Sequence, residues 1–109
     1  MTASKNEAAA MAELFHVVYS KTVLAKFRRI CALAEIRGEE QAVLRAGKQI
    51  DEALRSDPRG FGDLWYRLAK MQLDVYLRAV PPLLVYYGVH QTKKLVFVRR
   101  LEAIANLPG

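Results

Sequence analysis

The residues best suited to contacting another molecule are cationic and lie in the second half of the chain. From Leu64 onward only two residues are acidic, Asp74 and Glu102, whereas seven are basic: Arg67, Lys70, Arg78, Lys93, Lys94, Arg99 and Arg100. The whole chain carries a net charge of +6. Such an excess favours an anionic partner, either a nucleic acid or an acidic protein segment. The alternative is that these cations serve only solubility.

Arginines on predicted strands are the strongest candidates for anion contacts. We predict that Arg78 and one of Arg99 and Arg100 make such contacts. Successive residues of a strand point to opposite faces, so we expect only one of Arg99 and Arg100 to serve a given surface. The other candidates lie just ahead of these strands: Arg67 and Lys70.

Aromatic residues beside these cations offer a second kind of contact. Trp65, Tyr66 and Tyr86 could stack on the bases of a nucleic acid. Aromatics at such positions more often pack in a core, so both interpretations stay open.

The remaining chemistry-bearing residues receive structural interpretations. His16 alternates with apolar neighbours in a predicted strand, and His90 ends a strand beside a polar turn, so we expect a structural and a solvated role respectively. Cys31 lies in a strongly helical segment and is interpreted as a small core residue. Two histidines and one cysteine do not supply the ligands of a zinc site. We therefore predict no metal and no cofactor, and we assign no catalytic residue.

Hydrophobic periodicity indicates which elements position these side chains. Residues 1–14 are interpreted as an N-terminal leader, partly helical, with Ser4 and Glu7 at the spacing of a capping box. Residues 15–19 predict a strand that is apolar on both faces and therefore expected inside a sheet. Residues 21–37 and 39–57 predict two amphipathic helices joined at Gly38.

After the second helix the apolar period changes from that of a helix to that of a strand. Residues 59–63 predict a flexible turn, and residues 64–71 an irregular strand. Three strands then follow, at about 75–80, 84–89 and 95–101, separated by hairpin-length connections. The predicted fold class is α+β, in the order β-α-α-β-β-β, with a helical hairpin packed on a curved antiparallel sheet.

Length and composition bound the organisation. A chain of 109 residues, 52% hydrophobic, has room for a single domain, which we place at residues 15–109. No apolar run reaches the roughly 18 residues of a membrane helix, and no secretory signal is recognised, so we expect no membrane association and a cytoplasmic location. A single cysteine agrees with that compartment.

The order and spacing of these elements resemble the RelE/ParE superfamily of bacterial type II toxins. The resemblance covers about residues 15–101. It rests on the opening segment Phe15-His16-Val17-Val18-Tyr19-Ser20, the helix end Leu54-Arg55-Ser56-Asp57-Pro58, and two strand segments, Leu84-Val85-Tyr86-Tyr87-Gly88-Val89 and Leu95-Val96-Phe97-Val98.

The family implies two activities. RelE-like members cleave mRNA on the ribosome with basic and tyrosine side chains of the sheet, whereas ParE-like members are linked to poisoning DNA gyrase. Both kinds are held inactive by an antitoxin protein. Leu84 stands where the nuclease pattern has arginine, and Ile104 lies near another arginine position. Tyr87 follows the nuclease pattern, but we assign it to packing.

Three functions follow from the resemblance. The first is a toxin-like protein that inhibits growth through a protein or nucleic-acid target and is neutralised by an antitoxin. The second is a ribosome-dependent mRNA endonuclease whose basic residues have moved to Arg78, Arg99 or Lys70. The third is a non-toxic binding module of the same fold. The sequence leaves open whether the protein is an enzyme and whether it forms a homodimer.

Overall fold

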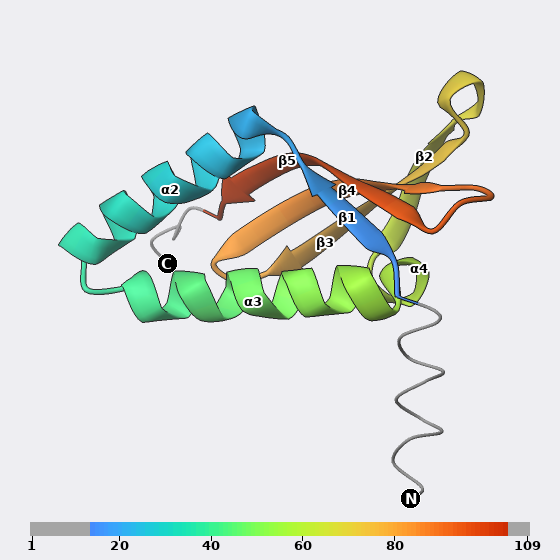
Figure 1. Cartoon of the computed structure of the whole chain (residues 1–109). Coiled ribbons are helices and arrows are strands. Elements are labelled where there is room, and N and C mark those ends of the chain that lie inside the picture. Colours follow the sequence, from blue (N-terminus) through green and yellow to red (C-terminus); the bar gives the residue numbers. More distant parts are fainter. Residues whose placement is uncertain (1–13, 105–109) are drawn as a thin grey trace, which may run out of the picture.

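The first half of the chain forms a short strand and a helical hairpin. The computed structural model describes residues 14–104 (Figure 1). Strand β1 (His16–Tyr19) leads into helix α2 (Lys21–Ile36), whose N-terminus is capped by Ser20 because the Ser20 hydroxyl accepts a hydrogen bond from Val23 N at 3.1 Å. Helix α3 (Glu40–Ser56) follows. Both helices lie where the apolar periodicity predicts them.

The turn between the two helices depends on Gly38. Its φ angle is +73°, a left-handed conformation that glycine adopts at little cost. Figure 1 shows α2 and α3 meeting at this turn and diverging from it. The buried faces of the two helices follow helical spacing: Val23, Ile30 and Ala34 in α2, and Val43, Ala46, Ile50 and Leu54 in α3.

A one-turn helix occupies part of the segment that the sequence predicts to be a flexible turn. Helix α4 spans Pro58–Phe61. The Asp57 side chain accepts a hydrogen bond from Gly60 N at 3.1 Å, and Pro58 takes the first helical position, where its missing N–H costs nothing. The Pro58 carbonyl accepts a hydrogen bond from the Tyr87 hydroxyl at 2.6 Å, which joins α4 to the sheet.

The second half of the chain builds the sheet. Its elements are β2 (Asp63–Leu68), the 3₁₀ turn η1 (Ala69–Met71), β3 (Leu73–Val80), β4 (Leu83–His90) and β5 (Leu95–Ala103). The strand order is β1-β5-β4-β3-β2, and all pairs are antiparallel except β1 with β5. The α+β class and the β-α-α-β-β-β order are confirmed. The sheet is mixed, and β2 gives it a fifth strand.

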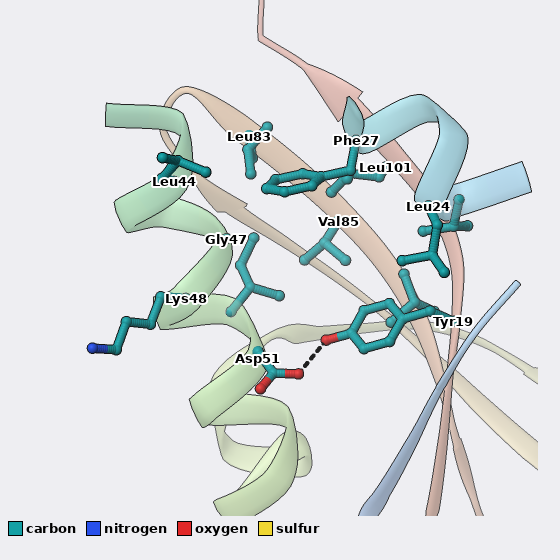
Figure 2. Close-up of a pocket in the computed structure, with 13 residues that line it drawn as sticks. Tyr19, Leu24, Phe27, Leu44, Gly47, Lys48, Asp51, Leu83, Val85 and Leu101 are labelled. Carbon is teal, nitrogen blue, oxygen red and sulfur yellow. Dashed lines mark hydrogen bonds between the residues drawn. The ribbon is translucent and has the colours of Figure 1, made fainter. Parts of the chain in front are cut away.

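Strand β1 lies at an edge of the sheet, so the expectation that it lies inside is wrong. Its helix-side face is covered, since Val17 is buried and the Tyr19 hydroxyl donates a hydrogen bond to Asp51 of α3 (Figure 2). On its other face His16 is exposed and Val18 is only partly buried.

One core lies between the helices and the sheet. Leu54 of α3 and Leu83, Val85 and Val89 of β4 are completely buried there. Tyr87 is also completely buried and stacks on Tyr76, with ring centroids 5.5 Å apart, which confirms its assignment to packing.

The expectations of an N-terminal leader and of no membrane helix can be compared with the structure only within residues 14–104. The predicted leader, apart from Leu14, lies outside the residues described. Within residues 14–104, none of the helices has the length and apolarity needed to cross a membrane.

Candidate functional site

The sheet has a face turned away from α2 and α3, which we call the open face. It carries a depression of about 510 Å³. Aromatic, apolar and cationic side chains surround it: Val18, Ser20, Trp65, Tyr66, Val75, Tyr86, Phe97, Val98, Arg99 and Arg100. This surface is the candidate site, because an exposed depression that combines aromatic rings with cations suits ligand binding better than packing.

A β-bulge in strand β2 brings two neighbouring aromatics to the open face. The pairing of β2 with β3 shifts between Leu64 and Tyr66, which leaves Trp65 as the extra residue. Trp65 and Tyr66 therefore both line the depression, although strict alternation would separate them. Their side chains remain accessible, at 58% and 39% exposure respectively.

A second bulge, in strand β5, brings Arg99 and Arg100 together to the open face. Tyr86 pairs with Arg100 and Tyr87 pairs with Val98, so Arg99 is the extra residue of β5. Both Arg99 and Arg100 line the depression. The expectation that only one of them serves a given surface is therefore wrong, because the bulge interrupts the alternation on which it was based.

Tyr86 lies at the centre of the ring contacts on this face. Its ring centroid is 5.4 Å from that of Trp65, and the Arg100 guanidinium carbon lies 5.5 Å from the Tyr86 centroid. Trp65 also meets Tyr66 edge-on, at 5.0 Å. The contacts hold the exposed rings in defined positions, which lowers the entropy that they would lose on stacking against a ligand.

The two arginines differ in their surroundings. Arg100 donates to Glu102 at 2.7 Å, and Glu102 also accepts from Lys26 of α2 at 3.1 Å. The hydrogen bonds from Arg100 and Lys26 hold the pKa of Glu102 below its usual value. Arg99 is exposed and has no such ion pair within the described part of the chain. Of the two arginines, Arg99 is therefore the more available to an incoming anion.

The other predicted cations do not line the depression. Arg78 pairs with Val85, which belongs to the helix side of the sheet, and its guanidinium donates to the Phe61 carbonyl and lies 4.8 Å from the Phe61 ring centroid. Arg67 lies 3.4 Å from Asp74. Lys70 is exposed in η1, at the far end of the β2–β3 hairpin. Of the predicted contacts, the structure brings together Arg99, Arg100, Trp65 and Tyr86.

The histidines and the cysteine lie away from this surface depression. His16 is exposed on β1, and the His90 ring accepts hydrogen bonds from the backbone N–H groups of Thr92 and Lys93, at 3.2 and 3.0 Å. Cys31 packs against the core, as expected. Across residues 14–104, no group of three or more His, Cys, Asp or Glu side chains could hold a metal ion.

The arrangement is suited to binding. A base can stack on Trp65 or Tyr66 while Arg99 contacts a phosphate. Phe97 and Val18 also line the depression, although the sequence does not predict either of them as a site residue. For Phe97 a signal is present, because it alternates with the buried Val96 and Val98. The depression's described lining has no histidine or carboxylate to transfer a proton.

Comparisons with protein-family models, with curated proteins and with solved structures found no match to this chain.

Proposed function

We propose that this chain is a toxin-like protein of the RelE/ParE type that binds single-stranded RNA through its open face in the cytoplasm and is neutralised by an antitoxin. The family resemblance and the β-α-α-β-β-β order support the toxin part of the proposal. The positive charge of the sheet half supports an anionic target.

One observation carries the choice of single-stranded RNA. The bulge in β2 places Trp65 and Tyr66 on one side of Tyr86, and the bulge in β5 places Arg99 and Arg100 on its other side. All five residues lie on one exposed face. Exposed rings bind unpaired bases by stacking, whereas bases within a duplex are already stacked on each other. Arginine supplies the phosphate contact.

Binding is tested by fluorescence anisotropy with labelled RNA of mixed sequence, single-stranded or in a duplex. We expect preference for the single strand. Trp65→Ala should weaken its binding about fivefold or more, since one stacked base is worth about 1–3 kcal/mol. Arg45→Ala, which removes an exposed arginine of α3 away from the open face, is the control. Equal loss of binding in both variants would mean that the RNA does not select the open face.

Toxicity is tested by induced expression in bacteria with a readout of translated mRNA. Growth arrest that Trp65→Ala and Arg99→Ala relieve supports the proposal. Cleaved mRNA would favour the endonuclease, and arrest with intact mRNA and an SOS response would favour gyrase as the target. Absence of arrest would leave a non-toxic binding module.

A further inference from the structure

The guanidinium of Arg100 presents two donors toward solvent at the open face. Its Nε atom donates to Oε2 of Glu102 at 2.7 Å, and its central carbon lies 5.5 Å from the Tyr86 ring centroid. Its two terminal amino groups make no hydrogen bond to a residue of the described range 14–104. The side chain is 65% exposed, so the planar edge of a ligand can reach both terminal nitrogen atoms.

Glu102 fixes the direction in which this guanidinium points. Its two carboxylate oxygens bind two cations, since Oε2 accepts from Arg100 and Oε1 accepts from Nζ of Lys26 in α2 at 3.1 Å. Tyr86 lies directly opposite Arg100 in the pairing of β4 with β5, and the guanidinium lies over its ring. The contacts with Glu102 and Tyr86 lower the side-chain entropy that Arg100 would lose on binding a ligand.

The side chains that line the depression are mainly hydrogen-bond donors. The described lining includes two arginines and a tryptophan, whose N–H groups only donate, and hydroxyl groups, which can donate or accept. No carboxylate or carboxamide side chain belongs to this described lining. A base that presents acceptors therefore fits the depression better than a base that presents amino groups.

Guanine is the base whose edge matches the terminal amino groups of Arg100. It presents two adjacent acceptors, O6 and N7, to which one arginine can donate two parallel hydrogen bonds. On the same edge adenine has an amino group in place of O6, cytosine presents an amino group, and uracil presents one carbonyl oxygen. This edge is accessible to side chains when the base belongs to a single strand.

We propose that Arg100 recognises guanine in single-stranded RNA through O6 and N7, and that Glu102 is the positioning residue that holds Arg100 over Tyr86. Guanine recognition rests on RNA binding by the open face, the proposed function, and adds a base preference to it. Trp65 supplies a stacking surface for any base, and Arg99 contacts a phosphate, so the preference depends on Arg100.

The probes are short labelled oligouridines that carry one guanosine or one adenosine, compared by fluorescence anisotropy with the full chain. The guanosine probe should bind about fivefold more tightly or better, the lower end of what a bidentate arginine contact provides. A probe with 7-deazaguanosine, which has a C–H group in place of N7, should lose most of this preference. A probe with inosine should keep it, because inosine lacks only the 2-amino group and retains O6 and N7.

Variants separate the base contact from charge. Arg100→Lys keeps the charge but cannot donate two parallel hydrogen bonds, and it should reduce the preference for guanosine to about twofold or less. Arg99→Gln is the matched control, since it removes the neighbouring cation of β5 and should weaken both probes by the same factor. Glu102→Gln should lower the preference and yet raise the affinity for the adenosine probe, because it removes a negative charge beside the RNA. A merely structural defect would weaken both probes.

Two results would overturn guanine recognition while RNA binding by the open face stands. The first is equal affinity for the guanosine and adenosine probes, with both weakened by Trp65→Ala. The second is a preference that persists in Arg100→Lys or with 7-deazaguanosine, in a variant that circular dichroism shows to be folded. Absence of binding to every probe would overturn both guanine recognition and the proposed function.

Discussion

Arg59 of the one-turn helix α4 binds the carboxylate of Asp74 in strand β3, with its Nη1 atom 2.9 Å from Oδ2. The same guanidinium donates to the Tyr76 hydroxyl and to the His90 carbonyl, each at 3.1 Å. One side chain therefore ties α4 to two strands of the sheet. Asp74 is the buried charged residue of the described core, at 6% exposure.

Removing this guanidinium should destabilise the fold. Arg59→Ala leaves the Asp74 carboxylate with Gln91 and the more distant Arg67, and we expect a loss of about 1–3 kcal/mol in the free energy of unfolding. Arg59→Lys should recover only part of it, because an ammonium cannot reach all three acceptors. Arg45→Ala is the matched control, and urea unfolding is the measurement. Equal stability of Arg59→Ala and wild type would contradict the assignment.

The pH dependence of stability should report the same carboxylate. The hydrogen bond from Arg59 holds the pKa of Asp74 below its usual value, which is about 3.9 in an unfolded chain. A carboxylate with a lowered pKa stabilises the folded state fully above about pH 4, and the contribution is lost as pH falls through the folded-state pKa. Asp74→Asn should therefore be less stable at neutral pH and lose stability less steeply below about pH 4. A wild type and variant with parallel acid unfolding curves would refute this.

Close packing at Gly62 should make it intolerant of a side chain. A Cβ there would lie 2.6 Å from the Tyr87 hydroxyl and 2.9 Å from the Leu77 carbonyl oxygen. We expect Gly62→Ala to cost about 1–3 kcal/mol, because the backbone of β3 cannot move away freely. Gly38→Asn is the control, since nothing lies within 4 Å of a Cβ there and asparagine tolerates the positive φ angle. The measurement is the unfolding temperature of both variants. A Gly62→Ala protein that unfolds at the same temperature as Gly38→Asn would contradict the prediction.

Salt dependence should count the phosphate contacts of the open face. For single-stranded RNA, each contact contributes about 0.7 to the slope of log affinity against log salt concentration. Arg99→Gln should reduce the slope by about that amount. Arg78→Gln should leave it unchanged, since Arg78 contacts Phe61 away from the depression. A slope that responds equally to both variants would mean that RNA does not select the open face.

The elements that could be predicted from the sequence are those whose signals lie within the element itself. Val43, Ala46, Ile50 and Leu54 predict helix α3 because helical spacing alone aligns them. Helix α4 is not predicted, because residues 59–63 are interpreted as a flexible turn. Its signals are nevertheless present in the sequence, since Asp57 forms a cap and Pro58 takes the first helical position.

Non-local features could not be predicted in the same way. The parallel pairing of β1 with β5 joins residues from opposite ends of the domain, and the hydrophobic periodicity of a strand does not indicate its partner. The bulges at Trp65 and Arg99 depend on how hydrogen bonds shift between strands. The candidate cations were therefore identified by type, while the face that each one occupies came from the structure.

The pairing of β1 with β5 has a consequence for synthesis of the protein. Of the strands in this sheet, β1 is synthesised first, and β5, to which it hydrogen-bonds in the described chain, is synthesised last. A nascent chain that stops before Leu95 holds His16–Tyr19 without a sheet neighbour, so the sheet closes only after β5 has been made.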